Sequence, residues 1–107
     1  MREIKESDWK ILRQLQPQAL ERLCREILLE IETINADTGN TFHQRYLSIY
    51  ETVQRRDKEI AHIFNGLGRS TALIKLAAMR SHGLLTEDEF SRFSQETRDV
   101  IASFFKT

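Results

Sequence analysis

The apolar residues of this chain recur every three or four positions along almost its whole length. That spacing is the period of an α-helix with one buried face, and no useful stretch alternates apolar and polar residues as a strand would. Only one proline and four glycines interrupt the pattern. It predicts an all-α protein, a bundle of four to five mostly antiparallel helices joined by short loops. We expect these helices at about 7–15, 17–35, 41–65, 70–82 and 86–105.

Polar and conformationally special residues mark where the helices begin and end. Pro17 is expected as the first residue of the second helix, because inside a helix it removes a hydrogen bond and clashes with the preceding turn. Residues 41–44 (TFHQ) and 86–89 (TEDE) form capping-box patterns that start the third and the last helix. Asn65-Gly66 and Gly83 are typical stop signals for the third and fourth helices.

The third helix carries a clear apolar stripe, which we expect to be buried in the bundle. Its members are Phe42, Tyr46, Ile49, Tyr50, Val53, Ile60 and Phe64. Asp57 falls about 40° from the middle of this stripe, where a carboxylate is costly unless it is paired. Two interpretations of Asp57 stay open: a buried ion pair with Arg56 at an interface or pocket, or a carboxylate at the rim of the core that reaches water or caps a neighbouring helix.

Some apolar residues exceed what a small bundle can bury. The fourth helix is apolar on nearly every side, which is typical of a central helix. Four or five short helices have difficulty surrounding one of their number completely. Leu29 and Phe105 also fall outside the main stripes, so we predict them as interface residues of a symmetric homodimer.

Composition and charge narrow the class of protein. Lys and Arg number 16 and so do Asp and Glu, so the net charge is zero and the basic footprint of a general nucleic-acid binder is missing. Cys24 is the only cysteine, and a lone thiol favours a reducing compartment. The first residues lack the apolar core of a signal peptide, and no apolar tract has the length of a membrane span. We expect a single cytoplasmic domain over residues 1–107 with no membrane partner.

One segment is similar to a known helical hairpin. In residues 73–93, LIKLAAMRSHGLLTEDEFSRF, a Leu-rich helix leads into Gly83-Leu84-Leu85-Thr86, which Glu87, Glu89 and Phe90 follow. These features resemble the short C-terminal domain family, a hairpin at the end of diverse bacterial proteins. The resemblance covers about a fifth of the chain. It implies a role in association between proteins.

The residues that carry catalytic or metal-binding chemistry do not group into a known constellation. Glu59 and His62 have the Glu-x-x-His spacing of carboxylate-bridged metal sites, but such sites need two of these motifs and the chain has one. At about 100° per residue, both side chains lie away from the apolar stripe and face solvent. We therefore expect no catalytic residue, no metal ion and no cofactor.

The turn between the third and fourth helices is the candidate ligand site. Two glycines lead into a helix whose first N–H groups are free, and an arginine stands beside two hydroxyls, an arrangement that suits an anion or phosphate. The residues are Gly66, Gly68, Arg69, Ser70 and Thr71. A plain helix–helix turn needs the same residue types, so that interpretation stays open beside the anion site.

Two functional hypotheses follow from these observations. The first is a non-enzymatic helical interaction or regulatory module, self-associating as a homodimer or binding another protein. The second is a binder of a small anionic ligand or nucleotide at the turn over residues 66–71. An enzyme is disfavoured because no catalytic constellation is found.

Overall fold

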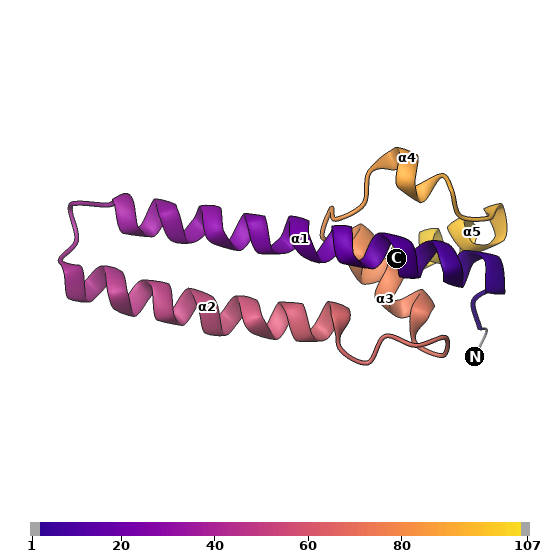
Figure 1. Cartoon of the computed structure of the whole chain (residues 1–107), viewed down its shortest axis with the longest axis horizontal. Coiled ribbons are helices and arrows are strands. Elements are labelled where there is room, and N and C mark those ends of the chain that lie inside the picture. The colour runs from indigo at the N-terminus through magenta and orange to yellow at the C-terminus, as the bar shows by residue number, and fades with distance from the viewer. Residues whose placement is uncertain (1–2, 106–107) are drawn as a thin grey trace.

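A computed structural model describes residues 3–105 and is helical throughout its regular structure. The helices, in chain order, are α1 (Glu6–Ala36), α2 (Phe42–Phe64), α3 (Ala72–Ser81), α4 (Glu87–Phe90) and α5 (Gln95–Ser103). The prediction of an all-α bundle with four to five helices is confirmed. Figure 1 shows α1 and α2 as a long antiparallel hairpin, with α3, α4 and α5 gathered at one end of it.

The first two predicted helices are one continuous helix, so the predicted break at Pro17 is wrong. Pro17 lies inside α1 on an exposed position, where the carbonyl that loses its partner can turn to water. A proline in a helix interior costs about 3 kcal/mol. Here the buried residues before and after it fall on one helical face, so packing holds both halves in register. These residues are Leu12, Leu15, Ala19 and Leu23.

The predicted start signal of α2 and the predicted stop signals of α2 and α3 are confirmed. The Thr41 hydroxyl accepts a hydrogen bond from the Gln44 N–H while the Gln44 side chain accepts one from the Thr41 N–H. This reciprocal pair is the capping box that starts α2. Gly66 and Gly83 follow α2 and α3 with φ of 71° and 69°, a left-handed conformation that glycine adopts without strain.

The last predicted helix, 86–105, is divided into α4 and α5, so this boundary was wrong. The capping box at Thr86 forms as predicted and starts α4. Four residues later the chain leaves the helix, and Ser94 caps a new one by accepting a hydrogen bond from the Thr97 N–H. The break lets Phe93 point into the core, where it is 1% exposed.

We call the region around this core the head: the first half of α1 together with α3, α4 and α5. The core residues it shares with the end of α2 are Ile4, Leu12, Leu15, Ala19, Leu23, Ile63, Phe64, Ala72, Leu73, Leu76, Ala77, Met79, Leu84, Leu85, Phe93 and Ile101. Five residues of α3 are buried, as expected for a central helix. None of the described helices is long and apolar enough to cross a membrane.

Candidate functional site

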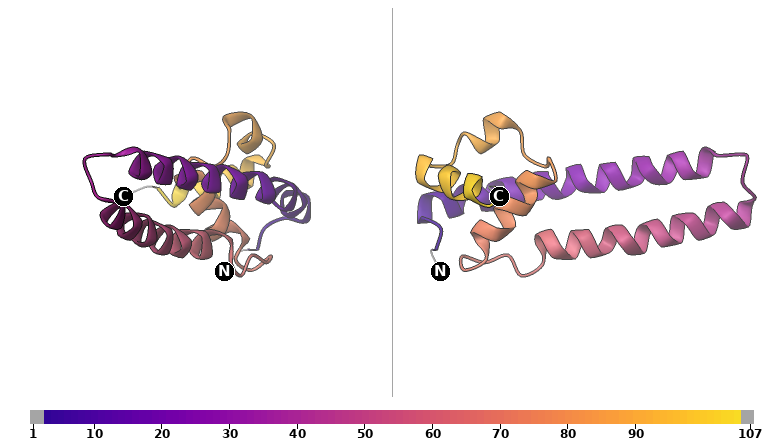
Figure 2. Two further views of the ribbon diagram at one scale, coloured as in Figure 1. Left: turned by 60° about the vertical axis from the view of Figure 1, so that its left-hand side comes forward. Right: turned by 180° about the vertical axis from the view of Figure 1, so that it is seen from behind.

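The second half of α1 and most of α2 project beyond the head as an arm, which we define as residues 24–58. Figure 2 shows this projection from two further sides, ending in the loop over residues 37–41. The molecule measures 52 × 30 × 25 Å. Its Cα radius of gyration is 16.8 Å, against about 13 Å for a compact chain of this length. The two arm helices contact each other along this projection.

One side of the arm is held by ion pairs that cross from α2 to α1. Arg55 Nη2 lies 2.9 Å from Glu30 Oε2. Arg56 is half-buried between the helices and lies within 3.6 Å of Glu26 and 3.5 Å of Glu30 on α1. It also lies 3.1 Å from Glu59, one turn along α2. We call this the charged side of the arm.

On α2, the side opposite to these pairs is aromatic and exposed. Phe42 is 83% exposed, Tyr46 62%, Tyr50 54% and Val53 44%. At about 100° per residue, all four lie roughly 140–180° around the helix from Arg55. The prediction that this stripe is buried in the bundle is therefore wrong for these four residues. The side of α2 that packs on α1 carries Thr52 and Ile63 instead, both of which are buried.

On α1, apolar residues occupy the same side of the arm. Leu28 is 61% exposed, and Cys24 and Ile31 are half-buried. These three lie within about 60° of one another around the helix, and Leu28 lies about 160° from both Glu26 and Glu30. Because the ion pairs place those glutamates on the charged side, the three apolar residues share the opposite side with the α2 stripe.

We call this two-helix surface the apolar face. Its members are Cys24, Leu28, Ile31, Phe42, Tyr46, Tyr50 and Val53. The rings of Tyr46 and Tyr50 are stacked with centroids 6.4 Å apart, and the Tyr50 hydroxyl accepts a hydrogen bond from Gln54. Large aromatic groups that are pre-ordered in this way can bind a partner at low cost in side-chain entropy.

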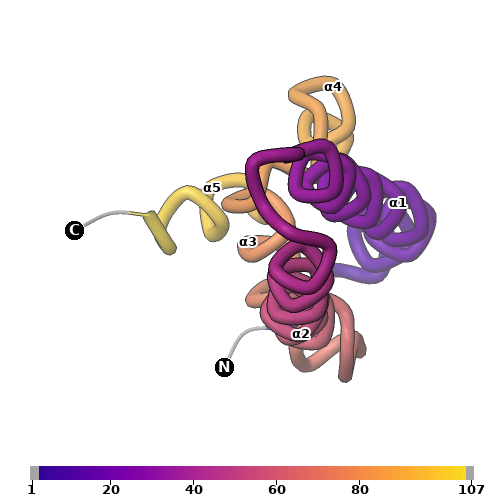
Figure 3. The backbone as a smooth tube through the Cα atoms, turned by 90° about the vertical axis from the view of Figure 1, so that its left-hand side faces the viewer, coloured from indigo at the N-terminus to yellow at the C-terminus, as the bar shows by residue number. Residues whose placement is uncertain are grey.

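The head does not cover the apolar face, because it packs on the other side of the hairpin. Arg22 lies one turn before Glu26, on the charged side of α1, and forms a double hydrogen bond with Glu89 of α4. Figure 3 looks along the hairpin from the tip of the arm. It shows α3 and α5 beside α1 and α2 on one side, α4 next to α1 at the edge of the hairpin, and no helix over the opposite side.

The two predicted interface residues are exposed but lie outside the apolar face. Leu29 is 50% exposed and points about 100° away from Leu28 around α1. Phe105 is 51% exposed and lines a small hollow of the head beside Arg80 and Phe90. The sequence predicts more apolar residues than a small bundle can bury. In the structure, most of the exposed large apolar residues lie on the arm.

The predicted buried ion pair of Asp57 with Arg56 is not formed. Asp57 is exposed on α2. Arg56 turns to the glutamates of the charged side instead. The physical reason is that the stripe beside Asp57 is itself open to water, so its carboxylate carries no burial cost. The alternative interpretation, a carboxylate that reaches water, describes Asp57 as it stands.

Arg69, the charged residue of the predicted anion site, is engaged by the start of the chain. Its Nη1 donates to Glu6 Oε2 at 2.7 Å, and its Nη2 donates to the Ile4 carbonyl at 2.9 Å. The nearby carboxylate already neutralises the guanidinium. This pairing ties the turn before α3 to the beginning of α1, which is a structural role.

The other members of the predicted anion site form a closed turn. The Thr71 hydroxyl donates to the Gly66 carbonyl at 2.7 Å and accepts from the Gly68 N–H at 3.0 Å. Ser70 is exposed. These bonds are those of a helix–helix turn, and the anion site at residues 66–71 stays a prediction.

The two buried acids of the described chain are fixed by hydrogen bonds within the head. Burial alone would raise the pKa of Asp8, but bonds from the Ser94 hydroxyl, the Ser94 N–H and the Thr97 hydroxyl hold that pKa below its ordinary value. The double hydrogen bond from Arg22 lowers the pKa of Glu89 to about 2. Both carboxylates join segments that are distant in the sequence.

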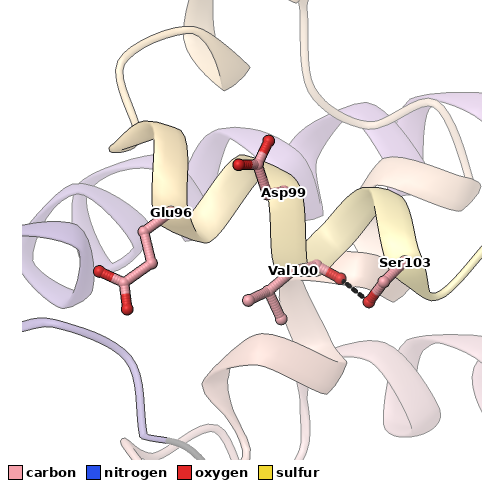
Figure 4. A pocket seen from close by; sticks show the side chains of 4 residues that line it. All are labelled: Glu96, Asp99, Val100 and Ser103. Carbon is pink, nitrogen blue, oxygen red and sulfur yellow. Dashed lines mark hydrogen bonds between the residues drawn. The ribbon is translucent and has the colours of Figure 1, made fainter.

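The remaining acidic groups have no arrangement suited to a metal ion. Figure 4 shows an open hollow along α5 lined by Glu96, Asp99, Val100 and Ser103. Glu96 pairs with Lys5 at 2.9 Å, and Asp99 accepts a hydrogen bond from Gln95. Among residues 3–105 no group of three or more His, Cys, Asp or Glu side chains could hold a metal ion.

Comparison with known proteins does not assign the fold to a family. The chain matches no family model, no curated protein and no solved structure. The resemblance of residues 73–93 to the short C-terminal domain hairpin stays a prediction. The surface of the arm therefore carries the functional proposal.

Proposed function

We propose that this chain is a non-enzymatic helical interaction module that binds a protein partner through the apolar face of its arm. One observation carries the proposal. The face is exposed on both arm helices, and no other described element lies over it. Contiguous apolar surface on a folded protein marks an interaction site, and Phe and Tyr are enriched in such sites.

The chemistry of the face favours a protein over a nucleic acid or an ionic ligand. The seven members of the apolar face carry no charged side chain, and the arginines of the charged side are engaged by glutamates. Nucleic-acid binding depends on unpaired basic groups. A helical surface of another protein supplies apolar side chains at matching spacing.

The ionisable groups with shifted pKa values support a role without catalysis. Asp8 and Glu89 are both occupied by bonds that hold the head together. Bonds of this kind maintain the fold, and they account for the shifted pKa values without a catalytic role. We assign the module to the cytoplasm, where the lone thiol of Cys24 stays reduced.

Two neighbouring leucines provide a matched test of the proposed function. Leu28 lies on the apolar face and Leu29 lies about 100° away from it, yet both are exposed on the same helix. Tagged wild-type protein, Leu28→Glu and Leu29→Glu are used to capture partners from extract of the source cells, with added copies of the chain itself. We expect wild type and Leu29→Glu to retain a common set of proteins that Leu28→Glu loses. Equal capture by all three proteins, or capture by none of them, would overturn the proposed function.

A further inference from the structure

We propose that the partner of the apolar face is a second copy of this chain, docked face to face so that the two arms form a four-helix bundle. This inference rests on the proposed function and names the partner of the same site. It follows from the thin core of the arm, the excess surface of the monomer and the distribution of charge.

The arm lacks a core of its own. Between residues 24 and 58 only Ile27 and Thr52 are buried. Helices in proteins owe most of their stability to packing of an apolar face, and a domain needs two packed layers. Two long helices with one narrow row of contacts therefore form half of such a structure, and the missing half is another layer of helices.

The surface left exposed matches the size of a dimer interface. One chain exposes 7107 Å². A compact protein of 12.6 kDa exposes about 6,200 Å². The excess of roughly 900 Å² is close to the ~800 Å² that each partner buries in a standard interface. A partner docked on the arm with an interface of standard size would bury about this much surface.

A second copy has the shape and charge that the apolar face requires. The face is two helices wide, and another hairpin offers an equally wide apolar layer, whereas a single helix would cover only part of that width. Two-fold pairing uses the same patch on both partners. The net charge of the chain is zero, and the arginines at positions 55 and 56 are paired on the side away from the interface, so neither the overall charge nor this ion-pair cluster opposes the pairing.

The mass of the protein in solution tests this inference. Wild type, Leu28→Glu and Leu29→Glu are measured by size-exclusion chromatography with light scattering from about 1 to 100 μM, a range that brackets micromolar association. We expect wild type and Leu29→Glu at twice 12.6 kDa. Leu28→Glu should run as a monomer, because a charge buried twice in a two-fold interface weakens association at least about 100-fold.

Circular dichroism separates loss of pairing from loss of folding. Leu28 is exposed in the single chain, so all three proteins should be equally helical at a concentration where Leu28→Glu is monomeric. A monomeric wild type throughout the range would overturn the second copy as partner. The capture experiment then decides by itself whether the apolar face binds a different protein. A dimer that resists Leu28→Glu and dissociates with Leu29→Glu would place the interface elsewhere and also overturn the inference.

Discussion

Single polar side chains join segments of the head that lie far apart in the sequence. Asp8 at the start of α1 accepts three hydrogen bonds at the beginning of α5, and Arg22 links α1 to Glu89 and to the Leu84 carbonyl. The partners are more than 60 positions apart, so no local pattern reveals them. Glu89 was predictable only as the last member of a capping box, which it also is.

The Arg22–Glu89 pair makes the stability of the head depend on pH. The pKa of Glu89 is about 2 in the folded chain and 4.5 as its ordinary value. The pair therefore contributes its full stability above about pH 4.5 and loses it as the pH falls towards 2. Glu89→Gln should lower the free energy of unfolding at pH 7 by about 1–3 kcal/mol, because it removes a charged hydrogen-bond acceptor.

Urea unfolding at pH 7, 4 and 2.5 measures this dependence. The difference in unfolding free energy between wild type and Glu89→Gln should shrink as the pH falls. The matched control is Glu87→Gln, since Glu87 lies on the same short helix and its side chain is 85% exposed. A difference that stays constant with pH would show that the pairing with Arg22 does not lower the pKa of Glu89.

The exposed apolar stripe of α2 shows the limit of what a sequence can say about a residue. Its members are Phe42, Tyr46, Tyr50 and Val53. Their spacing marks an apolar stripe, and the stripe exists. Whether the chain covers it depends on where α3, α4 and α5 pack, which is set by contacts between distant segments such as Arg22 with Glu89. The same limit applies to Arg56, whose partners Glu26 and Glu30 lie on another helix.

Among the helices, caps were predictable and continuity was not. The capping boxes at Thr41 and Thr86 and the stop at Gly83 depend on neighbours within a few residues, and all three are present. Whether the helix continues through Pro17 depends on two opposing free energies. One is the cost of a proline inside a helix, and the other is the gain from packing the buried residues before and after it. The break before Ser94 likewise depends on Asp8, which binds both the Ser94 N–H and its hydroxyl.

Replacing the proline inside α1 tests whether that helix is continuous. Pro17→Ala should raise the free energy of unfolding by about 1–2 kcal/mol, because the gain of a helix-interior hydrogen bond exceeds the added entropy of the unfolded chain. The change is measured by urea unfolding with Gln18→Ala as the exposed control on the same helix. A neutral or destabilising effect would place Pro17 at the start of a separate helix instead.

The overall form of the molecule is a head with an arm. An all-α bundle could be predicted because the helical period pervades the sequence. The arm could not, because it follows from the fusion of two predicted helices into the 31 residues of α1. That length carries the hairpin past the head. The helices α3, α4 and α5 are too short to cover the rest of the hairpin.

Hydrogen exchange tests most directly whether two arms pair through the apolar face. In a free arm with a thin core, backbone amides should exchange readily through local opening. Pairing of two arms should slow that exchange, so amides over residues 24–34 and 44–57 should become more protected as the concentration rises from about 1 to 100 μM. The amides of α3 and α5 should not change. Protection that is independent of concentration, or that rises in the head and not in the arm, would contradict the account.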